Sequence, residues 1–333
     1  MSHKKWSEID VLYSIGTILV ILGHSHSSDW STFAGTFLNP LNTFIYTFHM
    51  PLFFFVAGFL FWNSTSLERI GYGKWIKNKT VRLLTPYIVL SLIAFVPKYY
   101  VENHGFDGLT PNYIFEIIFV PRSSVWGHFW FLPTLLLLYV FWGFSKRFFQ
   151  SKKALVFWAI LSVVSVFLYF FPYSTNWFCF DDFKQAFIFF FFGMITNQTI
   201  KDKPRTAHTP YRIAWIIIGT IFSVFSSIYF NQNKIMLLLT AMVMISVCWQ
   251  IAVLVGQNKI TMWISENNFT IYIYSWPVQS VVMILAEKLV FPWYLTTLSM
   301  FSAGICVPVL IALVYKKSSR LNNHFLDLLV GAK

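Results

Sequence analysis

The chain has 333 residues, of which 56% are hydrophobic, 20% are aromatic and only 11% are charged. Soluble globular domains carry about 25% charged residues, so a soluble protein of this size could not cover its surface with so few charges. The composition excludes a water-soluble enzyme, a disordered scaffold and a secreted module held together by disulfides. It predicts an integral membrane protein in contact with the lipid bilayer.

The net charge of +12 has a simple explanation in a membrane protein. Cytoplasmic loops collect Lys and Arg, so the excess reflects topology, and we expect no nucleic-acid partner. Three widely scattered cysteines show no metal or redox spacing, and we predict no metal site. The sequence contains no Walker A loop, GxGxxG, HExxH or GxSxG motif, so hydrolase, P-loop ATPase and zinc-enzyme functions have no support. It indicates nothing about protein partners.

Apolar runs long enough to span a bilayer follow one another along the chain. A helix needs about 20 mostly apolar residues to cross about 30 Å of hydrocarbon. We identify ten such runs, at 10–27, 44–62, 83–101, 128–145, 154–172, 183–197, 212–230, 235–255, 269–287 and 294–315. The apolar stretch at 113–121 is too short to span and predicts an interfacial or re-entrant segment. The sequence therefore predicts an all-α polytopic membrane protein with about ten transmembrane helices.

The distribution of Lys and Arg sets the expected orientation. With a cytoplasmic N-terminus, 20 of the 25 cations fall on the cytoplasmic side. The outer side keeps only Lys98, Arg122, Lys184, Lys234 and Lys288. This bias predicts that both termini are cytoplasmic. No linker marks a second domain, so we expect a single membrane domain over 1–333, with its spans at about 10–315 and a short basic tail at 316–333.

The first predicted helix places polar residues near both of its ends. Lys5 and Asp10 lie at the cytoplasmic edge, and the sequence Gly-His-Ser-His lies at 23–26. Because 14 residues of helix span about 21 Å, Asp10 is too far from His24 to pair with it. A histidine inside a membrane helix usually faces a cavity and is a candidate for function. The alternative is that His24 and His26 are ordinary polar residues at a wet interface.

The second run carries another histidine at nearly the same depth as His24. His49 lies about one turn inside the outer boundary, and one short loop at 28–43 joins the two helices. Pro51 frees backbone groups that neighbours or water must satisfy. We expect His24 and His49 to face one cavity, and the alternative for His49 is a structural role at a packing kink.

Two further clusters carry candidate binding residues. Lys79 and Arg82 are spaced i,i+3 where the third helix enters the bilayer, so they share one face. Paired cations at the membrane surface suit a polyphosphate such as the nucleotide end of coenzyme A. The other positive charges in the loop before this helix are explained by the excess of Lys and Arg in cytoplasmic loops. Trp126, His128 and Trp130 open the fourth helix from the outer side, where tryptophans either anchor the helix at the interface or stack on a sugar.

Taken in chain order, these segments resemble the membrane acyltransferase-3 family, and the closest similarity is to its fucose-4-O-acetylase-like branch, which acetylates bacterial surface sugars. The most specific match is FHMPLFFFVAGF at 48–59. Further matches are Lys5-x-x-x-Ile9-Asp10, Lys79-x-x-Arg82, His128-x-Trp130-Phe131-Leu132 and the segment from Ser265 to Pro277. Together the matching segments extend over nearly the whole chain.

The chain departs from the family pattern at three positions. Tyr13 stands where many members have Arg or Lys, so a cationic contact is missing there. Lys79 replaces the first arginine of the basic pair, which keeps the charge but loses bidentate geometry. Ser275 stands where a late histidine is common, and we assign it no catalytic role.

The resemblance implies an acyl-CoA-dependent O-acyltransferase of the bacterial inner membrane. Acetyl would pass from acetyl-CoA to a sugar hydroxyl of a cell-surface polysaccharide, O-antigen or lipid-linked glycan. His24 would be catalytic, either as the general base on the acceptor hydroxyl or by first taking the acyl group itself. His49 would be a second catalytic candidate that orients or relays.

The resemblance also implies where the substrates bind. The coenzyme would lie near Lys5, Lys79 and Arg82, with Asp10 orienting Lys5 or Arg82. His128 and Trp130 are the candidates for contact with the sugar. Two alternatives stay open: a polysaccharide or lipid-linked sugar exporter without covalent chemistry, and an acyltransferase with another acyl donor.

Overall fold

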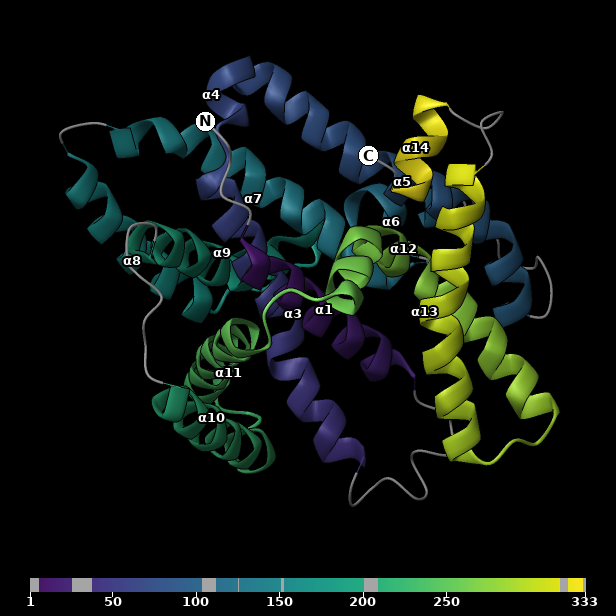
Figure 1. Cartoon of the computed structure of the whole chain (residues 1–333). Coiled ribbons are helices and arrows are strands. Elements are labelled where there is room, and N and C mark those ends of the chain that lie inside the picture. Colours follow the sequence, from purple (N-terminus) through teal and green to yellow (C-terminus); the bar gives the residue numbers. More distant parts are fainter. Residues whose placement is uncertain are drawn as a thin grey trace. The chain divides into compact units, whose positions relative to one another are not determined.

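The computed structural model describes residues 6–25, 38–103, 112–124, 126–150, 153–200, 209–317 and 323–331. Within these ranges every regular element is an α-helix or a short 3-10 helix (Figure 1). Eight of the described helices are long and apolar enough to cross a membrane. The chain is therefore an all-α, polytopic membrane protein, as predicted.

The chain divides into two compact units, one formed by Met1–Val56 with Lys201–Lys333 and the other by Ala57–Ile200. The described helices of the first unit are α1 (Ser7–His24), the first part of α3 (Leu38–Asn63), α10 (Thr209–Tyr229), α11 (Lys234–Val255), α12 (Lys259–Lys288), α13 (Trp293–Lys317) and α14 (His324–Val330). Those of the second are the rest of α3, α4 (Ser66–Ile70), α5 (Tyr72–Asn103), α6 (Asn112–Phe119), η1 (Pro121–Ser123), η2 (Gly127–Trp130), α7 (Phe131–Ser145), η3 (Lys146–Gln150), α8 (Ala154–Phe170), η4 (Trp177–Cys179) and α9 (Phe180–Ile200).

All ten predicted apolar runs fall on helices. Two of these helices are not among the eight candidate spans. Helix α8 has 17 residues, and α9 begins with Asp181, Asp182 and Lys184, which lower the mean hydropathy of its first turns. The short stretch at 113–121 forms helix α6, which has eight residues and is too short to span a bilayer.

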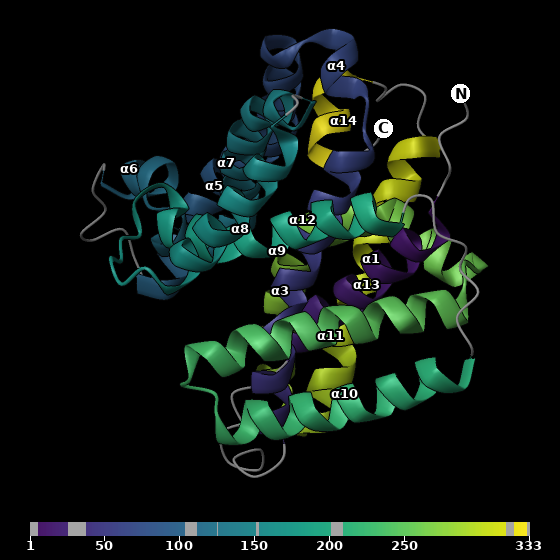
Figure 2. The ribbon, with the colours of Figure 1, turned by 90° about the vertical axis from the view of Figure 1, so that its left-hand side faces the viewer.

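In the first unit, α1 packs against α11, α12 and α13. The pairs α10–α11 (Figure 2) and α12–α13 (Figure 1) each form a helical hairpin. Ile21 of α1 is fully buried with Ile264 and Ile271 of α12 and Val309 of α13. Ser14 Oγ lies 2.8 Å from the Thr261 carbonyl oxygen, so a polar contact also joins α1 to α12.

The end of the chain is more than a basic tail, because it contains helix α14. Its last turn accepts two hydrogen bonds from α12: Thr270 Oγ1 donates to the Val330 carbonyl at 2.5 Å, and Tyr274 Oη donates to the Leu329 carbonyl at 3.0 Å. Tyr315 Oη of α13 donates to a carboxylate oxygen of Asp327. These contacts hold α14 against the two preceding helices.

The core of the second unit is aromatic and is centred on Trp142 of α7, which is fully buried. Its ring is nearly parallel to the rings of Phe190 and Phe191 of α9, with interplanar angles of 8° and 7°. Helix α3 contacts α9 through its backbone, because a Cβ at Gly58 would lie 1.9 Å from the Phe190 carbonyl oxygen. The many aromatic residues therefore serve packing in this unit.

The connector between α8 and α9 is tied to the first turn of α9. Lys184 Nζ lies 2.8 Å from Asp181 Oδ1 and donates to the carbonyls of Phe171 and Tyr173. Partial burial acts to raise the pKa of Asp181, but hydrogen bonds from Lys184 and neighbouring donors outweigh it and hold the pKa below its ordinary value. The ionised carboxylate thus contributes stability that is lost as pH falls through this lowered pKa.

Candidate active site

The end of helix α1 carries His24 and lies against the first part of α3. A Cβ at Gly23 would be 3.1 Å from the ring of Tyr46, so the absence of a side chain lets the two helices approach closely. The His24 side chain is half-buried, and the neighbouring Gly23 and Ser25 are buried. Helix α1 thus places the His24 imidazole in a partly enclosed position.

Tyr46 lies between the two predicted histidines. Its hydroxyl oxygen is 3.3 Å from His24 Nδ1 and 3.3 Å from the Gly23 carbonyl oxygen. Its ring centroid is 4.8 Å from that of the buried His49. Trp276 of α12 contacts His24 from another side, with ring centroids 5.0 Å apart. The structure therefore gathers both histidines around one tyrosine within the first unit.

The hydrogen bonds indicate which nitrogen of each imidazole carries the proton. The Gly23 carbonyl can only accept, so the Tyr46 hydroxyl donates to it and its oxygen accepts from His24 Nδ1–H. His49 Nδ1 lies 2.9 Å from the Ile45 carbonyl oxygen and therefore also carries a hydrogen. We assign these tautomers from the hydrogen-bond network. In this tautomer the lone pair of each ring lies on Nε2.

Gln279 of α12 holds the last turn of α1. The side chain is fully buried, and its Nε2 donates to the Ile21 carbonyl at 3.0 Å and to Ser25 Oγ at 2.8 Å. A Cβ at Gly304 of α13 would be 3.1 Å from the Gln279 side chain, so a glycine there makes room for the amide. The three helices α1, α12 and α13 thus meet next to His24.

Asp10 lies at the opposite end of α1. Lys5 lies outside the described residues, so its predicted contact with Asp10 stays a prediction. Asp10 Oδ1 accepts a hydrogen bond from Ser265 Oγ at 2.8 Å, and Oδ2 accepts one from Gln257 Nε2. Ser265 begins the late segment singled out in the sequence, and its position shows one use for that segment: it binds the aspartate of α1.

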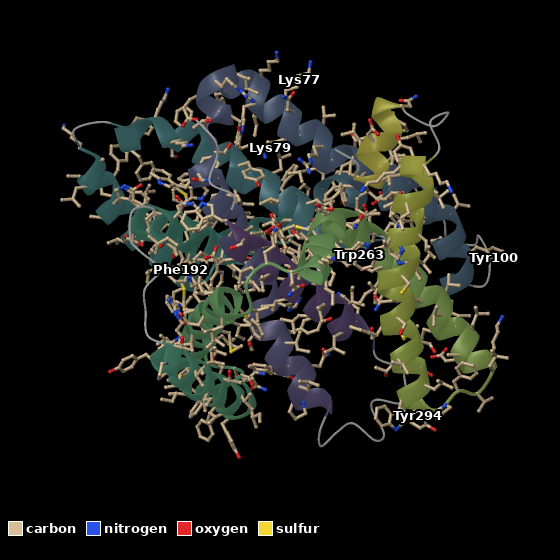
Figure 3. All side chains as sticks on the ribbon, viewed as in Figure 1. Lys77, Lys79, Tyr100, Phe192, Trp263 and Tyr294 are labelled. Atoms are coloured by element: carbon tan, nitrogen blue, oxygen red, sulfur yellow. The ribbon has the colours of Figure 1, made fainter. Side chains whose placement is uncertain are left out.

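The predicted coenzyme-binding cations lie on α5 in the second unit. Lys79 Nζ lies 4.6 Å from the ring centroid of Tyr139 and 5.5 Å from that of Trp75. Such cation–aromatic contacts hold a lysine side chain in one direction. Arg82 is exposed one turn further along the helix. Lys77 and Lys79, only two positions apart, leave α5 on different sides (Figure 3).

The predicted sugar contacts His128 and Trp130 lie on η2, also in the second unit. The guanidinium carbon of Arg122 stands 4.3 Å from the Trp130 ring centroid. Arg122 also makes a two-pronged ion pair with Asp182, which is 6% exposed. The Arg122 guanidinium therefore covers one face of Trp130.

Comparison with known proteins identifies the family. The acyltransferase-3 family model, described as "Acyltransferase domain", matches residues 6–316. The chain belongs to this acyltransferase family. It is also 26% identical over 198 residues to the nodulation protein NolL of Sinorhizobium fredii (strain NBRC 101917 / NGR234), which covers 59% of this chain and 50% of that protein. The chain thus spans about half the length of this curated relative. No solved structure matches the chain.

In this member of the acyltransferase family, the sequence predicted the two histidines but not the residues that contact them. Tyr46 and Gln279 gave no signal, because hydroxyl and amide side chains are common and their contacts join distant parts of the chain. Trp276 stood in a recognised segment without an assigned role. Among the described residues, no group of three or more His, Cys, Asp or Glu side chains could hold a metal ion.

Replacing Gln279 with Leu tests whether the amide positions the end of α1. Two hydrogen bonds are lost at similar side-chain volume, so we expect the acyltransferase to lose about 1–2 kcal/mol of stability. We expect its turnover to fall ~10-fold or more, because small displacements of a reacting group are costly. Thermal unfolding in detergent and steady-state kinetics measure the two effects.

The matched control is Gln198→Leu, which removes one exposed hydrogen bond from Trp62 in the second unit. We expect this control to change turnover by less than twofold. Equal turnover in Gln279→Leu and the wild type would show that the amide does not position His24.

Proposed function

We propose that the protein is an inner-membrane O-acyltransferase of bacteria that transfers acetyl from acetyl-CoA to a sugar hydroxyl. The acceptor class is a cell-surface polysaccharide, an O-antigen or a lipid-linked glycan. Family membership supports acyl transfer. The observation that carries the proposal is the contact of His24 with Tyr46, which places the ring proton on Nδ1 and the basic lone pair on Nε2 of a half-buried imidazole.

In the proposed reaction, His24 Nε2 removes the proton from the acceptor hydroxyl. The hydroxyl oxygen attacks the thioester carbonyl carbon, a C–O bond forms, and the C–S bond breaks. Coenzyme A leaves as a thiolate and takes up a proton, so that the ester and free coenzyme A are the products. Tyr46 accepts from Nδ1–H and thereby keeps the imidazole in the reactive tautomer, as the third member of a catalytic triad does. We assign His49 to orienting or relaying in the same cluster.

The donor is proposed to bind through its phosphates. Lys79 and Arg82 carry two positive charges on one face of α5, which suits the polyphosphate end of acetyl-CoA. Lys5 is the third proposed cation, and His128 and Trp130 are proposed to contact the glycan. In keeping with the cation distribution, we place both termini in the cytoplasm.

The proposed function predicts that purified protein releases free coenzyme A from acetyl-CoA only when a glycan acceptor is present. Lys79→Ala and Arg82→Ala should each raise the KM for acetyl-CoA by ~10-fold, the usual loss for a hydrogen bond to a charged group. The matched control is Lys77→Ala, since Lys77 leaves α5 on another side, and its KM should not change.

A thiol-reactive dye measures coenzyme A release, and mass spectrometry of the glycan identifies the transferred group by its added mass. An exporter would move glycan without consuming acetyl-CoA, and that result would contradict the proposal. An added mass other than acetyl would redefine the donor.

A further inference from the structure

A polar pocket opens at the start of α3 within the first unit. Its lining residues come from α3, from the turn after α10 and from α11: Asn42, Thr43, Tyr46, Thr47, Asn231 and Leu237. Five of the six carry hydrogen-bonding side chains, and none carries a charge. We call this the α3 pocket. Figure 2 shows the α10–α11 hairpin, whose turn supplies Asn231.

The helical period explains why the polar side chains of α3 gather in the pocket. Positions 42, 43, 46 and 47 share one face of the helix. The face around Ile45, Phe48 and Leu52 is buried in the protein core. Amide and hydroxyl groups that share one helix face are best satisfied by water or by a polar ligand. The composition of this face therefore points to a polar occupant.

Two polar side chains of α3 in the pocket, Asn42 and Thr47, differ in their hydrogen bonds. The side-chain oxygen of Asn42 is buried and has no hydrogen-bond partner in the described part of the chain. This oxygen faces helix α1, because a Cβ at Gly23 would be 3.7 Å from it. Thr47 Oγ1 already donates to the Phe44 carbonyl at 2.6 Å, so its oxygen is left to accept. Thr47 thus offers an acceptor to a hydroxyl group in the pocket.

The α3 pocket adjoins the histidine cluster through one shared side chain. Tyr46 lines the pocket, and its hydroxyl oxygen is 3.3 Å from His24 Nδ1. Gly23 also lies close to it, because a Cβ there would be 3.7 Å from the Asn42 side-chain oxygen. A molecule held in the pocket therefore lies one side chain away from the imidazole proposed to act as the base.

We propose that the α3 pocket binds a neutral sugar ring of the acceptor and presents one of its hydroxyls to His24. Sugar hydroxyls both donate and accept, which matches an amide and hydroxyl lining without charge. The Tyr46 ring and Leu237 offer apolar surface to the C–H face of the ring. This inference rests on the proposed acyl transfer and adds the place where the acceptor is held.

Binding and kinetics of three variants test the α3 pocket. The variants Asn42→Leu and Asn231→Ala remove polar groups, and Thr43→Val removes a hydroxyl with little change in shape, which protects the fold. Saturation-transfer NMR on detergent-purified protein uses methyl glycosides of glucose, galactose, mannose, rhamnose and fucose as probes. We expect the wild type to bind at least one of them, and each variant to bind it ~10-fold more weakly.

In the transfer assay, the same variants should raise the KM for the acceptor while leaving the KM for acetyl-CoA unchanged. The matched control is Gln232→Ala, which alters the residue next to Asn231 in the same turn, outside the pocket lining, and should behave as the wild type. A purely structural role would shift both KM values or the amount of folded protein, and would not single out the acceptor.

The outcomes separate this inference from the proposed function. If the wild type transfers acetyl and the variants keep the acceptor KM, the pocket assignment is overturned and the proposed function stands. If the wild type transfers no acyl group but the variants lose sugar binding, the pocket assignment stands alone. A wild type that binds none of the probe sugars overturns the assignment.

Discussion

Replacing His24 with Ala should lower acyl transfer by ~10²–10⁴-fold, the usual contribution of a positioned acid–base group. The imidazole is half-buried at the end of α1 and contacts the rings of Tyr46 and Trp276. Its removal deletes the base without opening the core, so the variant should stay folded in the membrane. Transfer of radiolabelled acetyl to the glycan measures the loss.

His24→Gln makes the test sharper. A glutamine amide can still donate to Tyr46, but it cannot take a proton from the acceptor, so this variant should be as inactive as His24→Ala. Tyr46→Phe keeps the ring and removes the hydroxyl that orients the imidazole, so a loss of ~10-fold is expected. The control His324→Ala changes a histidine of helix α14. Full activity in either His24 variant would refute the proposed base.

Replacing Gly58 with Ala should destabilise the second unit by about 3 kcal/mol or more, at the upper end for an overpacked core. The added Cβ would lie 1.9 Å from the Phe190 carbonyl oxygen and 2.7 Å from its carbonyl carbon. These are backbone atoms, so no side-chain rotation relieves the clash, and helices α3 and α9 must move apart. That movement also weakens the hydrogen bond from Asn197 Nδ2 to the Phe59 carbonyl.

Gly73→Ala is the matched control for this prediction. A Cβ at Gly73, in the first turn of α5, meets no atom within 4 Å. Alanine favours helix over glycine by about 1 kcal/mol, so this variant should be as stable as the wild type or slightly more stable. Thermal unfolding in detergent compares the two. Equal midpoints for both variants would contradict the close approach at Gly58.

Hydropathy located the helices well but misjudged where two of them begin. The run at 83–101 predicted the third helix, yet α5 begins at Tyr72. Its first turns carry Lys74, Lys77 and Lys79, which hydropathy assigns to a loop although lysine favours helix. Similarly, α12 begins at Lys259 and not near 269, and a capping box of Asn258 and Thr261 marks its start.

Only the site residues whose side chains are rare in membrane segments could be predicted from the sequence. His24 and His49 stood out because ionisable groups are costly in a bilayer. Tyr46, Trp276 and Gln279 are of common types, and their importance comes from contacts made by helices far apart in the chain. Gly58 lies in the most specific sequence match. A glycine is needed there because the backbone of α9 comes close to it, and this contact is seen only in the structure.

Helices α1 and α12 are joined by polar contacts at both ends and along their length: Asp10 with Ser265, Ser14 with Thr261, and Ser25 with Gln279. Sliding one helix along the other by a single residue, about 1.5 Å, would break these contacts together. Ser14, Ser25 and Gln279 are buried, so water cannot replace their contacts. Any motion of His24 during turnover should therefore carry both helices together as one rigid body, with the bending placed in the segments that connect this pair to its neighbours.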